Sequence, residues 1–288
     1  MAGDSDTSAA LAVPLACTVR GCGEPLARDG QRVVCPRRHT FDMARSGYFN
    51  LLQPQDRRSH APGDTSDAVA ARAASIAAGI GRSILTAVAS RAASFLPATG
   101  VVVDLGSGAG DLLGGLAEIR AIAGVGIDIS TAAADRAARR FPAVTWVVAN
   151  ADRRLPLLDR SVDVVLSVHG RRSPEECARV LKADGRLLIA VPAPDDLIEL
   201  REQVQGEGVQ RERADAVISE HHGAFTLAER TEIRERHDLE RRELVNLLKG
   251  TYRGARHGVA GRVEQLEKMR VTLASDVLMF RLEPSTDT

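Results

Sequence analysis

The stretch that decides the fold is Val101-Val102-Val103-Asp104-Leu105-Gly106-Ser107-Gly108-Ala109-Gly110. Its first half is a β-branched, apolar run typical of a buried strand, and its second half is a G-x-G-x-G turn before a predicted helix that begins near Asp111. Glycines lack a Cβ and accept positive φ, so the backbone can approach a ligand closely, and the free amides of the helix N-terminus face that ligand. An ordinary tight turn is the alternative interpretation.

A second acid lies at the predicted tip of the next strand, in Gly126-Ile127-Asp128-Ile129-Ser130. Asp128 can accept hydrogen bonds from both hydroxyls of a ribose, or it can cap the following helix. Dinucleotide sites use G-x-G-x-x-G, whereas this loop is shorter and directly follows the acid Asp104. Both differences favour S-adenosylmethionine (SAM), with Asp104 orienting the loop or binding the ammonium group. The predicted SAM contacts are Asp104, Gly106, Gly108, Ala109, Gly110, Asp128 and Ile129.

Five short apolar runs alternate with helical segments after residue 100, at 101–105, 125–129, 144–148, 162–168 and 186–191. This alternation predicts a mostly parallel, doubly wound sheet, and hence an α/β fold of the Rossmann-like class I SAM-methyltransferase type. A helix pair precedes the first strand. The later pattern predicts helices at 197–206 and 238–248, and strands near 231–235 and at 271–282, which suit the antiparallel edge of such sheets.

The chain divides into four predicted segments. Residues 1–16 are small and polar without periodicity, which predicts a mobile tail. Residues 17–55 are turn-rich with few large apolar residues, as in a metal-stabilised module. Residues 56–98 form a linker and helices, and residues 99–288 form the methyltransferase domain.

Three of the four cysteines lie in the N-terminal module, as Cys17-x4-Cys22 and, after twelve residues, Cys35-x3-His39. Two ligand pairs separated by a loop are typical of a zinc ribbon, because zinc takes four tetrahedral N and S ligands at about 2.0–2.3 Å. A closed shell leaves no open position, so the zinc is expected to be structural. Unpaired thiols or a disulfide are the alternatives. Cys177 stands alone and is expected to be a buried small apolar residue.

The ends of the third and fourth predicted strands carry further polar residues. Asn150, Ala151 and Asp152 follow the third strand, where class I methyltransferases contact adenine, and a solvated turn is the alternative interpretation. His169 ends the fourth strand, at the edge where reacting groups lie in such sheets, or it simply caps a loop.

Composition excludes several classes of protein. The longest apolar stretches, such as 187–194, are far shorter than the roughly 18 residues that span a bilayer. The apolar run 9–16 follows acids and not cations, so it does not predict a signal peptide, and we expect a cytoplasmic location. Net charge is zero, but residues 17–60 hold eight arginines against four acids and are therefore +4.

Several motifs together resemble one family. They are the Cys17/Cys22/Cys35/His39 cluster, the segment 39–52 (HTFDMARSGYFNLL), Pro62-Gly63-Asp64 and the glycine loop. On these residues the chain resembles, over nearly its whole length, the 23S rRNA (guanine-N1-)-methyltransferases, which include members that confer macrolide resistance. The segment after His39 is the most specific part of the resemblance.

The resemblance implies a zinc module that helps to dock an rRNA hairpin, a SAM site at the glycine loop, and methyl transfer to a ring nitrogen of guanine. Gly108 and Ala109 match SAM contacts of the family. The chain has Cys17-x4-Cys22 where relatives often have Cys-x2-Cys, and Gly79-Ile80-Gly81 where they carry Gly-His-Tyr. Asp196 stands where relatives can carry a histidine close to SAM, and we include it among the predicted cofactor residues.

Methylation of guanine N1 requires the loss of its proton, and a base near the sheet edge would help. His169 is the first candidate and Asp152 the second. Tyr48, Phe49 and Tyr252 are candidates for stacking on bases, or for the core. Two other functions are open: a small-molecule methyltransferase, and a non-enzymatic zinc-ribbon RNA-binding protein with a degenerate SAM fold. Association as a homodimer is also open.

Overall fold

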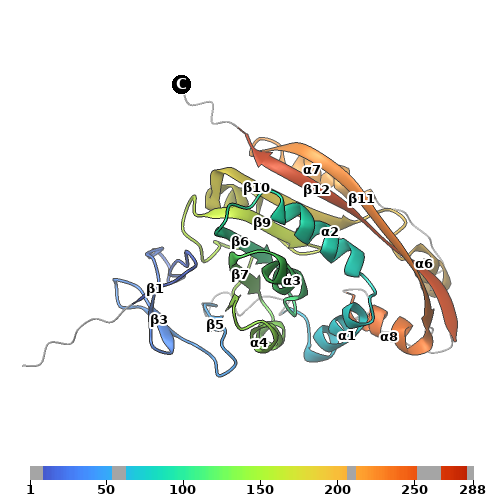
Figure 1. Cartoon of the computed structure of the whole chain (residues 1–288), viewed down its shortest axis with the longest axis horizontal. Helices are drawn as coiled ribbons and strands as arrows, with labels where there is room; N and C mark the ends of the chain where they lie inside the picture. The colour runs from blue at the N-terminus through green and yellow to red at the C-terminus, as the bar shows by residue number, and fades with distance from the viewer. Residues whose placement is uncertain (1–8, 54–62, 206–211, 252–266, 284–288) are drawn as a thin grey trace, which may run out of the picture.

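The computed structural model describes residues 9–53, 63–205, 212–251 and 267–283 (Figure 1). Within these residues the chain forms an eight-stranded sheet in the order β11-β12-β10-β9-β6-β7-β8-β5 and a small four-stranded sheet, β1-β2-β3-β4. The five central strands are parallel and match the predicted ones: β6 (Gly100–Leu105), β7 (Ile122–Asp128), β8 (Thr145–Val148), β9 (Val162–Val168) and β10 (Leu181–Pro192). The predicted α/β doubly wound fold is confirmed.

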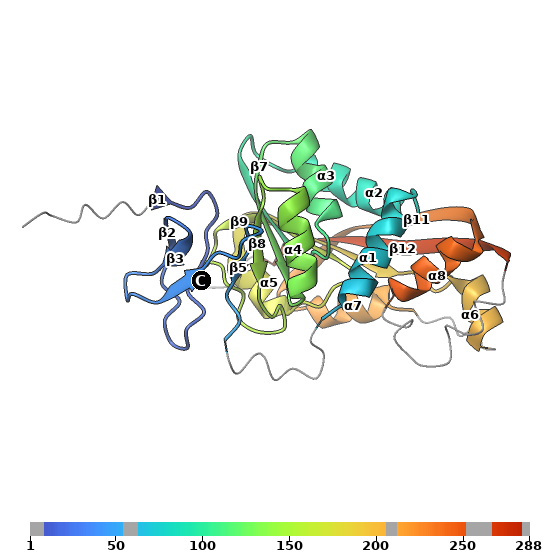
Figure 2. The same cartoon turned by 90° about the horizontal axis from the view of Figure 1, so that it is seen from below.

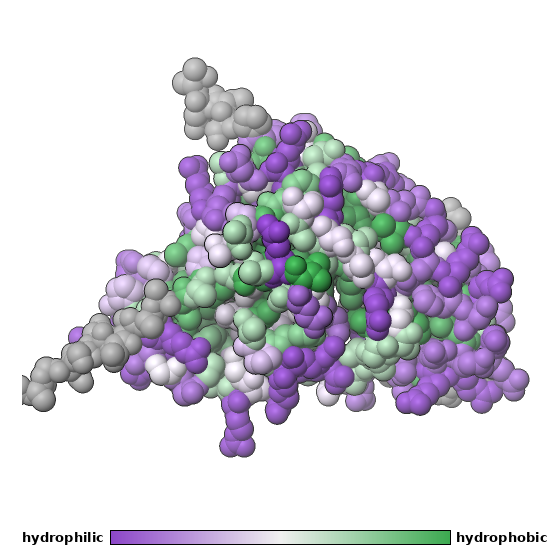
Figure 3. All heavy atoms as spheres, viewed as in Figure 1, coloured by the Kyte–Doolittle hydropathy of each residue, from purple (hydrophilic) through white to green (hydrophobic). Residues whose placement is uncertain are grey.

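The far edge of the sheet is antiparallel, as predicted. Strand β12 (Lys268–Leu282) pairs with β10, and β11 (Phe225–Glu240) pairs with β12. The sequence predicted only about five residues of β11, because charged residues recur through the rest of the strand and interrupt the apolar alternation. On the face seen in Figure 3, hydrophilic side chains cover this outer edge. Charges on an edge strand oppose unwanted strand pairing.

Helices cover both faces of the sheet (Figure 2). The apolar sides of α2 (Arg82–Ala93), α3 (Asp111–Ile119) and α4 (Thr131–Arg140) pack in one core with Val102, Trp146 and Leu188. On the opposite face, α5 (Pro174–Val180) and α7 (Ala214–His221) pack in a core that contains Val103, Leu187 and Ile189. Neighbouring residues of a strand point alternately into the two cores. Both faces of these strands are therefore buried, which explains why they are apolar throughout. The sequence did not predict α7.

Three further helices flank the far end of the sheet: α1 (Ser66–Ala77), α6 (Ile198–Gln205) and α8 (Arg241–Lys249). Helix α1 begins after Thr65, whose hydroxyl accepts a hydrogen bond from the amide of Ala68. Figures 1 and 2 show α1 and α8 side by side. No helix in the described ranges can cross a membrane alone; α1 and α2 reach the required length only together, and they are bent by 81°.

The N-terminal module contains β1 (Ala9–Ala10), β2 (Ala27–Asp29), β3 (Arg32–Val34) and β4 (Thr40–Asp42). It is joined to the catalytic domain, because β5 (Phe49–Asn50) pairs in parallel with β8 at the edge of the main sheet. The module therefore supplies a strand to the sheet that carries the glycine loop.

The expected mobile tail is wrong for the part of residues 1–16 that the structure describes. Val13 is 4% exposed and Leu15 is 0% exposed, and Leu15 forms an antiparallel bridge with Leu157. The surface that buries this short apolar run lies about 140 positions further along the sequence, so local periodicity could not reveal it. Residues 1–8 and the linker residues 54–62 lie outside the described residues.

Candidate functional site

The glycine loop lies at the carboxyl end of β6, between β7 and β9, where the strand order reverses direction. Open α/β sheets bind ligands at this switch point. Gly106, Gly108 and Gly110 have φ of 74°, 54° and 82°, a left-handed conformation that side chains with a Cβ rarely adopt. Gly110 is the N-cap of α3, so the loop presents backbone amides to a ligand.

Trp146 on β8 forms the floor beneath the loop. A Cβ on Gly110 would lie 2.5 Å from Cη2 of its ring, and a Cβ on Gly126 would lie within 3.0 Å of two ring carbons. The indole nitrogen donates a hydrogen bond of 2.9 Å to the carbonyl of Phe141, which holds the ring in place. The sequence pattern indicated that the loop glycines serve backbone conformation and ligand approach. It gave no sign that Trp146 packs against them.

The two predicted acids lie beside the loop. Asp104 is 2% exposed, and no described residue donates a hydrogen bond to its carboxylate. Burial, and then the nearby charge of Asp128, raise the pKa of Asp104 to about 7. Asp128 accepts hydrogen bonds of 2.8 Å from the amides of Gly108 and Ser130, and burial raises its pKa.

These residues fit SAM. A buried carboxylate without a donor is costly unless a ligand supplies one, and the ammonium group of SAM is such a donor. Each Asp128 oxygen accepts one bond here and keeps a lone pair for a ribose hydroxyl. The three glycines themselves place no side chain between the loop amides and a ligand.

The Gly63-Asp64 part of the resemblance motif lies against the second strand tip, while Pro62 lies outside the described residues. A Cβ on Gly63 would lie 2.7 Å from Cγ2 of Ile129, and the hydroxyl of Ser130 donates to the Asp64 carbonyl at 2.7 Å. The motif thus covers Ile129 next to the proposed ribose ligand.

The third strand ends in a turn. The amide of Asp152 donates to the side-chain oxygen of Asn150 at 2.9 Å, and Ala151 is half-buried between them. The exposed Asp152 carboxylate forms an ion pair of 2.6 Å with Arg171. The structure therefore shows the turn, and adenine contact by Asn150 and Ala151 stays a prediction.

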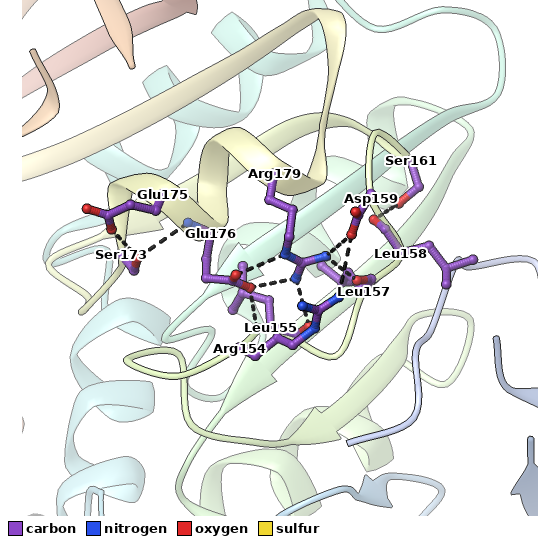
Figure 4. Close-up of polar contacts among 10 residues, drawn as sticks. All are labelled: Arg154, Leu155, Leu157, Leu158, Asp159, Ser161, Ser173, Glu175, Glu176 and Arg179. Carbon is purple, nitrogen blue, oxygen red and sulfur yellow. Dashed lines mark hydrogen bonds and ion pairs between the residues drawn. The ribbon is translucent and has the colours of Figure 1, made fainter. Parts of the chain in front are cut away.

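Arg179 on α5 fixes the segment that follows this turn (Figure 4). Its guanidinium donates to the carbonyls of Leu155 and Leu157 at 3.0 and 2.9 Å, and it pairs with Asp159 at 2.6 Å. Glu176 accepts from Arg179 and from the amide of Leu155. Because Leu157 bridges to Leu15, this network also supports the contact surface of the N-terminal module.

His169 directly follows β9 and lies beside the loop, since the Cα of the neighbouring Gly170 would lie 3.3 Å from a Cβ on Gly106. Its Nε2 lies 2.9 Å from the hydroxyl of Ser275 on β12, and its φ is 53°. Desolvation of the imidazole by the surrounding protein lowers the pKa of His169 to about 4, and the positive charges of Arg72 and Arg213 lower it further. His169 is therefore neutral near pH 7.

Asp196 lies after β10 on the same edge of the sheet. Its carboxylate accepts a hydrogen bond of 3.0 Å from the amide of Ala274, and burial raises its pKa to about 6. Gly81, where relatives carry an aromatic residue, instead faces Leu273, and its amide donates to Glu235.

The four predicted zinc ligands lie together, with all ligand atoms within 4.8 Å of one another. The sulfurs of Cys22 and Cys35 are 3.8 Å apart, and Nδ1 of His39 is 3.4 Å from the sulfurs of Cys17 and Cys35. A tetrahedral zinc shell requires spacings of about 3.4–3.8 Å between such atoms. The cluster fits zinc, with His39 presenting Nδ1.

The remaining single-residue predictions concern Cys177 and three aromatic residues. Cys177 is fully buried in α5, as expected. Phe49 is 3% exposed and packs in the core, which supports the core alternative and not stacking on bases. Tyr48 is half-buried. Tyr252 lies outside the described residues.

Two protein-family models match this chain, one over the metal cluster and one over the glycine loop. Residues 16–60 match the zinc-ribbon family model described as "RlmA, N-terminal", and residues 102–185 match the model described as "Methyltransferase domain". The chain therefore combines a zinc ribbon with a SAM-dependent methyltransferase fold.

Three curated relatives carry the same type of name. The 23S rRNA (guanine(748)-N(1))-methyltransferase of Streptomyces fradiae is 38% identical over 62% of this chain and 64% of its own length. Proteins described as 23S rRNA (guanine-N(1)-)-methyltransferases are 33% identical in Micromonospora griseorubida, over 62% of this chain and 66% of that protein, and 30% identical in Bacillus subtilis, over 64% and 67%.

The chain thus spans slightly less than two thirds of the length of the first of these relatives. The alignment covers 62% of this chain, whereas the motifs suggested a resemblance over nearly its whole length. The Bacillus subtilis relative is 30% identical to this chain and is covered over 67% of its own length. The chain belongs to the family of the 23S rRNA (guanine-N(1)-)-methyltransferases.

Proposed function

We propose that this protein transfers a methyl group from SAM to N1 of a guanine in a hairpin loop of 23S rRNA. The observation that supports this most directly is the buried carboxylate of Asp104, to which no described residue donates a hydrogen bond, beside three left-handed glycines, in a chain whose N-terminal module carries a four-ligand metal cluster. The names of its relatives supply the substrate class.

When bound, SAM would supply a methyl group activated by its sulfonium centre. Asp104 would bind the ammonium group, Asp128 the ribose, and the 150–151 turn the adenine. The chain's own contribution is alignment, and holding two reactants in line can lower a barrier by about 7–11 kcal/mol. Zinc would have no catalytic part, because Cys17, Cys22, Cys35 and His39 would fill its coordination shell.

The guanine N1 proton needs an acceptor. His169 is our first candidate, since it lies beside the loop and is neutral near pH 7, so a nitrogen lone pair is free for a proton. Asp152 is the second candidate, and its carboxylate is ion-paired with Arg171.

RNA binding would use the N-terminal module. Arg20, Arg38 and Arg45 are exposed there, and no described residue pairs with them, so they are free for phosphate contacts. A guanine in a loop exposes N1 at lower cost than a paired one. The proposal places the protein in the cytoplasm with ribosomal RNA and requires only one copy of the chain; a homodimer stays a prediction.

SAM affinity is expected to rise about fivefold to tenfold between about pH 6 and pH 7.5. The pKa of Asp104 is about 7 in the free protein, so its carboxylate is largely protonated at the lower pH and largely ionised at the higher one. Only the ionised form pairs with ammonium. Calorimetry across this range measures the change, and Asp104→Asn should bind weakly with no pH step. A step that persists in Asp104→Asn would belong to another group.

The experiment that tests the function is transfer of labelled methyl from SAM to 23S rRNA that lacks the modification, followed by mapping of the altered base. Label at guanine N1 in a hairpin loop is the expected result. SAM binding without transfer to RNA would favour a small-molecule substrate, and RNA binding without SAM binding would favour a non-enzymatic protein. In single-turnover reactions, a full rate for His169→Ala would rule out His169 as the base.

A further inference from the structure

Arg72 lies against the glycine loop, although it is distant from it in sequence. It is on α1, and its Nη1 would be 3.7 Å from a Cβ on Gly108. The same nitrogen pairs with the carboxylate of Asp64 at 2.6 Å. Nε and Nη2 donate to the carbonyl of Gly250, at the end of α8, at 3.0 and 2.6 Å. Asp64 and the end of α8 therefore hold the guanidinium over the loop.

These contacts leave part of the guanidinium unused. Arginine has five N–H donors in a rigid plane, and three of them point to Asp64 and Gly250. One donor remains on Nη1 and one on Nη2. The side chain is 38% exposed, so a ligand above the loop can reach it. Two neighbouring nitrogens with a free donor each match the two oxygens of a carboxylate.

The charges around the loop explain why a cation is needed there. Asp64, Asp104 and Asp128 are three acids in a small region, which suits the sulfonium and ammonium groups of SAM but repels its carboxylate. The positive charge of Arg72 acts on both Asp128 and His169. It lowers the pKa of Asp128, against the effect of burial, and it lowers the pKa of His169.

We propose that Arg72 binds the carboxylate of the methionine moiety of SAM, opposite Asp104, which binds the ammonium group. This inference rests on the proposed function for its ligand. It assigns the recognition of the amino-acid end of SAM to a helix that precedes the Rossmann-like domain.

The test measures binding of two ligands by the full-length protein with its zinc. SAM and decarboxylated SAM differ only in the carboxylate. Arg72→Gln should weaken SAM about 10- to 100-fold in calorimetry, and should change decarboxylated SAM by less than about twofold. Wild type should prefer SAM by a similar factor. Equal weakening of both ligands would mean a structural role, and no weakening would mean no role; either result overturns the proposal.

Arg91→Gln is the matched control, because its side chain is 37% exposed, is also ion-paired, and lies on the adjacent helix. It should leave both affinities unchanged. If Arg72→Gln does not fold, Arg72→Lys keeps the charge without the planar pair of donors, and should lose affinity for SAM only. Wild type that binds neither ligand would overturn the proposed function as well, whereas wild type that binds both equally would overturn this inference alone.

Discussion

Cys35→Ala is expected to remove the bound zinc, to unfold the N-terminal module and to abolish methyl transfer to RNA. The strands of this module are two or three residues long, and few large side chains are buried among them. Structural zinc contributes about 10–16 kcal/mol to the folding of comparable peptides, more than such a small core can replace. Metal analysis, hydrogen exchange of residues 17–42 and transfer of labelled methyl to RNA measure the three effects.

The effect should extend into the catalytic domain. Strand β5 pairs with β8, and the amide of Leu51 donates to the carbonyl of Val148 at 3.0 Å, so the module completes the sheet edge next to the adenine-side turn. SAM binding should therefore weaken, although less than RNA methylation, because Asp104 and the loop lie further inside the sheet.

Cys177→Ala is the control for this prediction. Cys177 is equally buried but lies in α5, outside the cluster, so the variant should keep one zinc and its activity, with a loss of about 1 kcal/mol of stability. A Cys35→Ala protein that keeps one zinc and full transfer to RNA would contradict the assigned ligand set.

The parts of the fold that sequence predicted are those where local pattern and tertiary environment agree. Strands β6 to β10 are apolar because both faces are buried, and the glycine loop is required wherever such a strand turns into a ligand-binding helix. The zinc ligands were predictable for a similar reason, because four ligands at ribbon spacing have few other uses. Spacing could not show that His39 presents Nδ1.

The parts that sequence missed depend on partners far along the chain. Leu15 appeared to belong to a tail because its partner, Leu157, follows the third strand of the catalytic sheet. The choice between stacking and core packing for Phe49 stayed open, because a two-residue strand gives no periodicity. Arg72 belongs to no sequence motif, and its approach to Gly108 exists only after α1 folds over the loop.

Gly126→Ala is expected to destabilise the protein by about 1–3 kcal/mol or more and to weaken SAM binding by about two orders of magnitude. Gly126 lies directly opposite Trp146 in the β7–β8 pair, and an added Cβ would overlap the indole ring. The ring cannot turn away freely, because it is 1% exposed and bonded to the Phe141 carbonyl. Strand β7 must shift instead, and Asp128, two residues further, moves with it. Thermal unfolding and calorimetry with SAM measure both effects.

Gly115→Ala in α3 is the matched control, because a Cβ there meets no atom within 4 Å. Alanine favours a helix interior over glycine, so this variant should gain about 0.5–1 kcal/mol of stability and bind SAM normally. A double-mutant cycle identifies the cause of the Gly126→Ala loss. Trp146→Leu opens a cavity, and if steric overlap is the cause, Gly126→Ala should cost less in that background than in wild type. Equal costs in both backgrounds would show that overlap with the indole is not the cause of the loss.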